Sequence, residues 1–243
     1  MQQTADFYFH GSLNDFLRRV KRDTRLAYTF SSHQTVKDMI EAIGVPHVEV
    51  WEVLVHEERV PLSHRLQPAD RVEVYPYDGR EEELLQGIAD RKFVLDVHLG
   101  TLARSLRMLG FDTVYANTFT DKDIAGIAEA EQRIVLTRDV NLLKQKAIPA
   151  GYWLRSQHTE EQLTEVIRRF RLLDLIRPFS RCMVCNGMIA AVPKETVLDQ
   201  LPPKTKLYFE KFYRCASCQR VYWKGTHYER MQELVYRLFM ENY

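Results

Sequence analysis

The side chains of this chain that could carry out metal chemistry are its cysteines and a set of aspartates. The chain has four cysteines, and they form two Cys-x-x-Cys pairs, Cys182 with Cys185 and Cys215 with Cys218. Two such pairs can place four thiolates about 2.3 Å from one zinc ion. The 29 residues between the inner cysteines leave room for a zinc ribbon with an extended hairpin. Disulfides are the alternative, which we do not expect because the N-terminal sequence lacks an export signal.

A zinc ion held by four thiolates has no open coordination position for water. We therefore predict one structural zinc ion, which stabilises the fold and takes no part in a reaction. The sequence also lacks the G-x-S-x-G, Walker A and G-x-G-x-x-G patterns, which would indicate a serine nucleophile or a nucleotide site. A catalytic site, if the chain has one, has to be built from other residues.

Four aspartates occur where predicted strands give way to loops or helices: Asp96, Asp121, Asp123 and Asp139. Asp96 directly follows the apolar residues 93–95, and Asp139 closely follows residues 134–136. Ligands of parallel α/β sheets bind beyond the carboxyl ends of the strands, where these side chains are expected. The alternative for each aspartate is a structural one, because Asp at the start of a helix is a preferred N-cap.

Several carboxylates that converge on one edge repel one another unless a divalent cation lies between them. Ligands that are all oxygens favour Mg²⁺ or Mn²⁺ over zinc. Such ions activate water for attack on a phosphodiester and neutralise charge on the leaving oxygen. His98, two residues beyond Asp96, could assist, although a histidine at a helix start more often caps or packs.

The N-terminal part of the chain has the element order of a β-grasp fold. Predicted strands cover residues 5–10, 25–30, 48–55 and 71–75, and a helix that contains Val36, Met39, Ile40 and Ile43 ends at Gly44. Residues 53–76 resemble ubiquitin-like proteins of the sulfur-carrier type, which work through a free C-terminal Gly-Gly. This chain has only Gly79 there and continues, so we expect a docking or packing surface instead. The charged segment Tyr77 to Gln86 is the predicted linker.

From Lys92 onward, short apolar strands alternate with amphipathic helices. Strands are predicted at residues 93–95, 113–115, 133–137 and 152–154, and helices at 99–109, 124–131, 140–145 and 160–173. This alternation predicts an α/β domain whose parallel sheet is covered by helices on both faces.

The charges of the two parts differ in sign, which favours an anionic ligand for the C-terminal part. Residues 1–90 hold 10 Lys and Arg against 16 Asp and Glu, whereas residues 91–243 hold 24 against 17. Arg104, Arg107 and Arg138 lie close in sequence to the aspartates and are predicted phosphate contacts. Basic and aromatic residues interleave over 204–224, which suits single-stranded RNA, although these rings could equally form the core of a small module. No apolar run approaches a membrane span, and we expect a cytoplasmic protein.

The ordered combination of motifs resembles the Mut-seven C-terminal ribonuclease family. The segments that carry the resemblance are FVLDVHLGTLARSLRMLGFDT, TDKDI, RIVLTRD, CMVCNG and CASCQRVYWKGTHYERM. The resemblance implies a ubiquitin-like domain at residues 1–79, a PIN-like nuclease domain at 91–178, and a zinc ribbon with a C-terminal helix at 179–243.

It also implies metal-dependent cleavage of RNA, with Asp96, Asp121 or Asp123, and Asp139 as ligands of Mg²⁺ or Mn²⁺. Many PIN nucleases have a Glu in the middle acidic position and a further Asp after the last strand. This chain has Asp121 and Asp123 in the middle position and no acid directly after residues 152–154, which implies a second metal ion that is weakly held or absent. The alternative function is a non-catalytic RNA-binding adaptor, in which the β-grasp domain docks a protein partner and the aspartates only cap helices.

Overall fold

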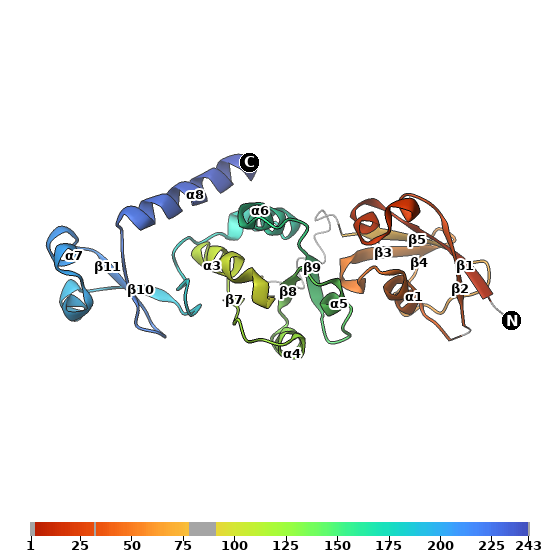
Figure 1. The fold of residues 1–243 in the computed structure, drawn as a ribbon, viewed down its shortest axis with the longest axis horizontal. Helices are drawn as coiled ribbons and strands as arrows, with labels where there is room; N and C mark the ends of the chain where they lie inside the picture. The colour runs from red at the N-terminus through yellow and green to blue at the C-terminus, as the bar shows by residue number, and fades with distance from the viewer. Residues whose placement is uncertain (1–2, 32, 78–90, 243) are drawn as a thin grey trace. The chain divides into compact units, whose positions relative to one another are not determined.

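The computed structural model describes residues 3–31, 33–77 and 91–242 (Figure 1). The chain divides into two units, one formed by Met1–Ala89 with Thr120–Leu154 and the other by Asp90–Phe119 with Arg155–Tyr243. Of the predicted linker, Tyr77 to Gln86, only Tyr77 lies within the described residues. None of the helices in the described part of the chain is both long and apolar enough to span a lipid bilayer.

The first unit begins with a β-grasp region, as predicted. Its sheet has the order β2-β1-β5-β3-β4, in which β1 is parallel to β5 and the other pairs are antiparallel. The elements are β1 (Gln3–Phe9), β2 (Leu26–Phe30), α1 (Val36–Ile43), β3 (Val50–Val55), β4 (Glu58–Arg59) and β5 (Arg71–Pro76), with short 3₁₀ helices η1 (Gly11–Phe16), η2 (Arg19–Lys21) and η3 (His47–Glu49).

The alternation of side chains along β1 explains how this sheet covers its core. Ala5, Phe7 and Phe9 are buried, whereas the residues between them are more exposed, because successive side chains of a strand point to opposite faces. The buried side of α1, with Ile40, belongs to the same core. Thr35 caps α1 in a reciprocal capping box, and the helix ends at a glycine, as the sequence predicts.

The first unit also contains α4 (Asp121–Glu131), β8 (Ile134–Thr137), α5 (Val140–Leu143) and β9 (Ala150–Trp153). Strands β8 and β9 are parallel, and all four residues of β8 are buried, as in a sheet covered on both faces. The β-grasp region packs on β9, because the Phe16 and Trp153 rings lie 5.1 Å apart. The Trp153 backbone N–H also donates to Oε1 of Glu49 at 2.7 Å. Packing is therefore one role of the β-grasp region.

The second unit contains the parallel pair β6 (Phe93–Leu95) and β7 (Thr113–Val114). Its helices are η4 (Val97–Leu99), α3 (Gly100–Met108), α6 (Thr159–Arg169) and η5 (Leu173–Leu175), and α3 packs against α6. The predicted helix over 160–173 is wrong at its C-terminal end. The chain leaves the helix after Arg169 and takes up a left-handed conformation at Arg171, where φ is 49°.

The C-terminal part of the second unit is the cysteine-containing ribbon. Its antiparallel sheet has the order β10-β11-β12, and the long helix α8 follows (Figure 1). The sequence left room for an extended hairpin between the cysteine pairs, but only the short strands β10 and β11 pair there. The residues between these strands fold into short helices over a small core of Val197, Leu201 and Phe212. The elements are β10 (Ile189–Val192), η6 (Lys194–Thr196), η7 (Leu198–Gln200), α7 (Pro203–Tyr208), β11 (Phe212–Cys215), β12 (Val221–Trp223) and α8 (Thr226–Asn242).

Candidate functional site

The four cysteines form a cluster that can hold a metal ion such as zinc. Their four sulfur atoms all lie within 4.8 Å of one another, close enough to share one ion. Among the described residues, no other group of three or more His, Cys, Asp or Glu side chains meets this condition. Sγ of Cys182 lies 3.6 Å from Sγ of Cys218, and Sγ of Cys185 lies 3.4 Å from Sγ of Cys215. Zn–S bonds of about 2.3 Å in a tetrahedron require similar sulfur separations. The donor set therefore fits zinc.

The protonation of the sulfurs also suits a cation. Burial opposes ionisation of Cys182, but hydrogen bonds from the Tyr222 hydroxyl and from backbone N–H groups lower its pKa to about 6. The Arg220 backbone favours the thiolate of Cys218, yet burial and the three neighbouring sulfurs raise the pKa of Cys218 to about 12. Four thiolates at these distances repel one another, and a dication removes that repulsion.

Each cysteine pair lies in the same type of tight turn. The Asn186 N–H donates to the Cys182 carbonyl at 2.9 Å, and the Gln219 N–H donates to the Cys215 carbonyl at 3.1 Å. Both donors have a left-handed backbone conformation. A Cβ at Gly187 would lie 2.4 Å from Oγ of Ser217 and 2.8 Å from Sγ of Cys215, so this position requires glycine.

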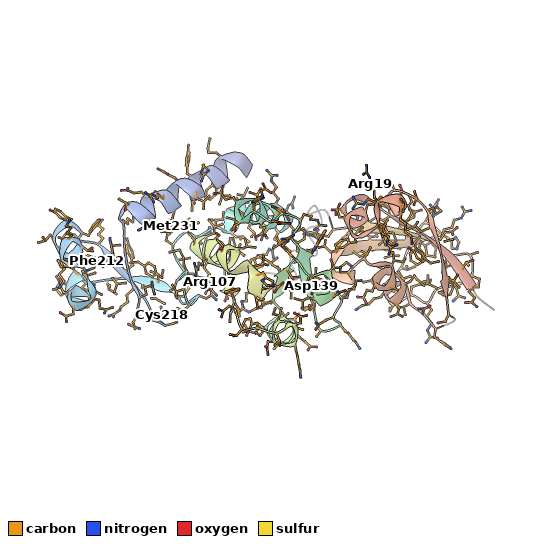
Figure 2. All side chains as sticks on the ribbon, in the orientation of Figure 1. Arg19, Arg107, Asp139, Phe212, Cys218 and Met231 are labelled. Carbon is orange, nitrogen blue, oxygen red and sulfur yellow. The ribbon has the colours of Figure 1, made fainter. Side chains whose placement is uncertain are left out.

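Arg107 lies on α3 (Figure 2). Its hydrogen bonds join the first cysteine turn to the α/β part of the second unit. Its guanidinium is buried and donates to the carbonyls of Thr113 at 2.9 Å, Met183 at 3.2 Å and Val184 at 2.9 Å. Burial lowers the pKa of Arg107, while the thiolates of Cys182 and Cys185 oppose that shift. The predicted phosphate contact by Arg107 conflicts with this geometry, because the side chain is buried and its Nε and Nη1 donate to protein carbonyls.

Asn186 is a second anchor between the same parts. Its side-chain oxygen accepts from the Thr113 N–H at 3.0 Å, and its amide donates to Asp112 at 2.8 Å. Arg181 donates to the Gly110 carbonyl at 3.2 Å and pairs with Asp112 at 3.5 Å. Sequence reasoning missed Asn186, although its place directly after Cys185 in the CMVCNG segment was the available signal.

The four predicted aspartates are divided between the two units, one in the second and three in the first. Asp96 directly follows β6 in the second unit at the N-cap of η4, and its side chain does not cap that turn. The other three lie in the first unit. Asp139 follows β8 as the N-cap of α5, where Oδ1 accepts from the Asn141 N–H at 2.8 Å. Asp121 is exposed at the first position of α4.

Asp123 forms a capping box with Thr120. Its Oδ2 accepts from the Thr120 backbone N–H at 2.8 Å and from Oγ1 at 2.7 Å, which lowers the pKa of this exposed carboxylate. The capping alternative therefore holds for Asp123 and Asp139. A cap does not exclude metal binding, because an ionised carboxylate has about four lone-pair positions.

The remaining predicted phosphate contacts, Arg104 on α3 and Arg138 before Asp139, are exposed. Trp153 supports the backbone at Arg138, since its indole N–H donates to the Arg138 carbonyl at 3.1 Å. In the ribbon, Phe212 belongs to the small core and Phe209 and Trp223 pack against it. The core alternative therefore holds for these three rings, and RNA contact by the remaining ribbon aromatics stays a prediction.

Comparison with known families gave two matches. A family model described as the Mut7-C RNAse domain matches residues 91–235, and one described as Mut7-C ubiquitin matches residues 2–82. Two crystal structures of small archaeal modifier protein 1 from Haloferax volcanii each align with 30% of this chain, at 13% and 14% identity and a TM-score of 0.25. The alignments cover 97% and 93% of those chains. No curated protein matches the sequence.

Proposed function

We propose, from the premise that this chain belongs to the Mut7-C RNase-domain family, that it is a ribonuclease that hydrolyses RNA phosphodiester bonds at an aspartate-lined Mg²⁺ or Mn²⁺ site. The observation that carries the proposal is the match of the RNase domain to residues 91–235. The cysteine cluster supports it as a separate structural zinc site, because four thiolates leave the zinc no position for water.

The proposed ligands of the catalytic ion are Asp96, Asp139 and Asp121. Asp96 and Asp139 each follow the carboxyl end of a strand, which is where α/β sheets bind ligands. Asp121 is preferred over Asp123, because Asp123 already accepts two hydrogen bonds from Thr120. The hydrogen bond from Asn141 to Oδ1 fixes the orientation of the Asp139 carboxylate and leaves Oδ2 for the ion.

The chemistry expected of an ion at these carboxylates is activation of water and neutralisation of charge on the cleaved phosphate. The residues of this chain would orient the ion and hold the RNA. Arg104 and Arg138 are exposed cations, the first on α3, which follows Asp96 and η4, and the second directly before Asp139, and we assign them to phosphate contacts. The β-grasp region, which packs on β9 through Glu49, leaves its remaining surface for a protein partner.

Cleavage of labelled single-stranded RNA by the zinc-loaded chain tests the proposal. We expect cleavage with Mg²⁺ or Mn²⁺ and none in Asp96→Asn or Asp139→Asn, with far-UV circular dichroism and zinc content unchanged. Asp121→Asn and Asp123→Asn are a matched pair on one helix, and we expect loss of cleavage only in Asp121→Asn. Wild-type protein that is fully zinc-loaded and cleaves no RNA with either ion would overturn the proposal.

The capping contacts of Asp123 and Asp139 favour a second candidate, the non-catalytic RNA-binding adaptor. In an adaptor, the only role of these carboxylates would be to cap helices. Asp139→Asn keeps a capping oxygen, so it would change neither stability nor RNA affinity in an adaptor. Loss of cleavage in this variant separates the two functions.

A further inference from the structure

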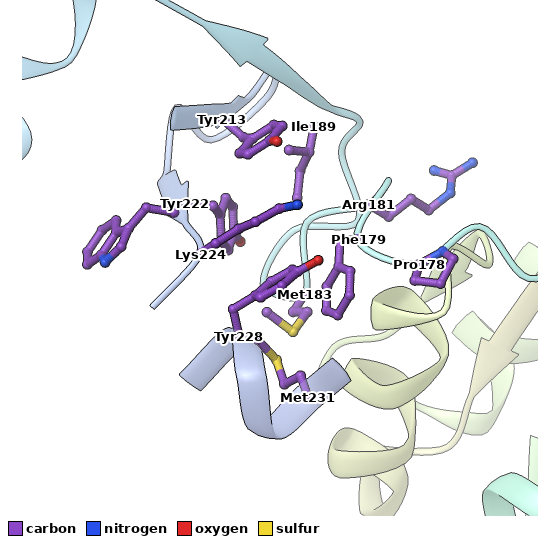
Figure 3. A pocket seen from close by; sticks show the side chains of 11 residues that line it. Pro178, Phe179, Arg181, Met183, Ile189, Tyr213, Tyr222, Lys224, Tyr228 and Met231 are labelled. Atoms are coloured by element: carbon purple, nitrogen blue, oxygen red, sulfur yellow. The ribbon is translucent and has the colours of Figure 1, made fainter. Parts of the chain in front are cut away.

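A pocket of about 230 Å³ lies between the ribbon sheet and the start of α8 (Figure 3). Its lining comes from the segment before the first cysteine pair, from the cysteine turn itself, from all three ribbon strands and from α8. The apolar side chains that matter here are Phe179, Met183, Tyr213, Tyr222, Tyr228 and Met231. Ligand pockets for larger molecules span roughly 300–1,000 Å³, so this one fits a single flat group.

Most rings of the pocket do not belong to the core of the ribbon, although Trp223 both lines the pocket and packs against that core. The core consists of Val197, Leu201 and Phe212, whereas Tyr213, Tyr222 and Tyr228 are only half-buried. The Phe179 and Tyr228 rings form one side of the pocket, with centroids 4.6 Å apart and planes inclined by 44°. These rings therefore present accessible aromatic faces, which a small core does not need.

The charge of the pocket is positive. Among the described residues that line it, none is acidic, and Arg181 and Lys224 are the cations. Arg181 is committed to the Gly110 and Asn186 carbonyls and to Asp112, and its guanidinium points away from the rings in Figure 3. Lys224 instead places Nζ 5.2 Å from the centre of the Tyr228 ring, at the aromatic surface. Lys224 is thus positioned to pair with an anionic group attached to whatever stacks there.

We propose that this pocket binds one unstacked base of single-stranded RNA, with the base on the aromatic side chains and the adjoining phosphate at Lys224. Aromatic side chains beside a cation bind single strands in this way, because each base offers a π-face and each nucleotide a charge. The proposal rests on the proposed ribonuclease function, and it assigns the ribbon a direct part in holding substrate.

The pocket depends on the zinc site and on the start of α8. The Tyr222 hydroxyl lies 3.0 Å from Sγ of Cys182, so a zinc-bound thiolate would fix the Tyr222 ring in the pocket wall. Lys224 and Gly225 connect β12 to α8, whose first residues, 226–231, bring Tyr228 and Met231 to the pocket. This gives a physical role to the GTHYERM residues.

The test compares two ligands, a short fluorescein-labelled oligouridylate and an abasic ribose-phosphate chain of the same length. Fluorescence anisotropy is measured on the zinc-loaded full chain without Mg²⁺ or Mn²⁺, so that cleavage does not contribute. We expect wild-type protein to bind the oligouridylate about 5- to 150-fold more tightly than the abasic chain, which is the range for stacking of one base. Tyr228→Leu should lose most of this preference.

Tyr236→Leu is the matched control, because Tyr236 is 64% exposed on α8 and lies outside the pocket. It should keep the wild-type preference. Lys224→Gln should reduce the salt dependence of binding by about 0.7 in the log–log slope, the value for one phosphate contact to a single strand. Lys194→Gln should leave the slope unchanged, since Lys194 pairs with Glu210 at 2.7 Å.

Equal binding of both ligands by wild-type protein would overturn the pocket assignment. So would a Tyr228→Leu variant that retains both zinc and the wild-type preference. Wild-type protein that cleaves RNA but shows no preference would refute the pocket alone. Wild-type protein that shows the preference but never cleaves would refute the nuclease and leave the pocket standing.

Discussion

Replacement of Arg107 by methionine should weaken the attachment of the cysteine ribbon to the α/β part of the second unit. Methionine keeps most of the apolar stem but removes the donors to three carbonyls, those of Thr113, Met183 and Val184. An unpaired buried carbonyl costs about 1–3 kcal/mol, and hydrogen bonds from a charged donor contribute about 1.5–3 kcal/mol each. The Met183 and Val184 carbonyls can regain water, and the buried charge no longer has to be desolvated. We therefore expect a loss of about 3 kcal/mol in the free energy of unfolding.

The assay is urea unfolding of the zinc-loaded protein in a Trp51→Phe, Trp153→Phe background. Trp223 is then the remaining tryptophan and reports on the ribbon. For a slope of about 2 kcal/mol per molar urea, the loss corresponds to a midpoint about 1.5 M lower. Arg107→Lys should lose about half as much, because an ammonium cannot reproduce the planar array of donors.

Arg104→Met is the matched control, one turn earlier on α3 at an exposed position. Its stability should stay within about 0.5 kcal/mol of wild type. The reasoning is refuted if Arg107→Met and Arg104→Met unfold at the same urea concentration.

Three further outcomes follow from other contacts. Glu49→Ala should destabilise the first unit by about 2 kcal/mol, because the backbone N–H of Trp153 loses its acceptor. Glu49→Gln keeps an acceptor oxygen and should lose less stability. Equal urea midpoints for the two variants would contradict this. Burial, and then the nearby Lys37, lower the pKa of His47 in the folded protein. As the pH drops, His47 therefore takes up a proton more readily in the unfolded chain than in the folded one, and the free energy of unfolding should fall between about pH 7 and about pH 5. A His47→Gln variant with the same pH profile would show that another group is responsible. Because the Cys218 thiol has a pKa of about 12, zinc uptake near neutral pH must release its proton, and the apparent zinc affinity should rise at least about tenfold per pH unit in competition titrations; a pH-independent affinity would contradict the proposed four-thiolate site.

Local sequence patterns predicted the main strands and helices that precede the ribbon. Strand β1 shows the alternation of a half-buried strand, and Thr35 with Asp38 is a capping box that can be read from residue order. The cysteine spacing likewise predicted the metal cluster, since short pairs restrict where thiols can point. The end of α6 was missed because Phe170 and Leu173 continue the apolar period after the backbone has left the helix at Arg171.

Long-range contacts decided the features that the sequence could not predict. Arg107 was predicted to contact phosphate because it lies close in sequence to Asp96. Its partners Met183 and Val184 lie 76 and 77 residues away, so the sequence around Arg107 gives no sign of them. The same holds for the pocket, since the Phe179 and Tyr228 rings are in contact although one residue precedes the ribbon in the sequence and the other follows it. Asp123 shows the converse case, because its partner Thr120 is three residues away and the cap was open to prediction.

The central claim is that aspartates at the strand ends bind a catalytic divalent ion. The most direct measurement is a calorimetric titration of Mg²⁺ and Mn²⁺ into zinc-loaded wild-type protein and into Asp139→Asn, with zinc content checked before and after. We expect saturable binding of at least one ion by wild-type protein and loss of that binding in Asp139→Asn. The stability of the metal-free variant should be unchanged or slightly higher than that of wild type, because repulsion between carboxylates is relieved. Identical heats for the two proteins would contradict the central claim.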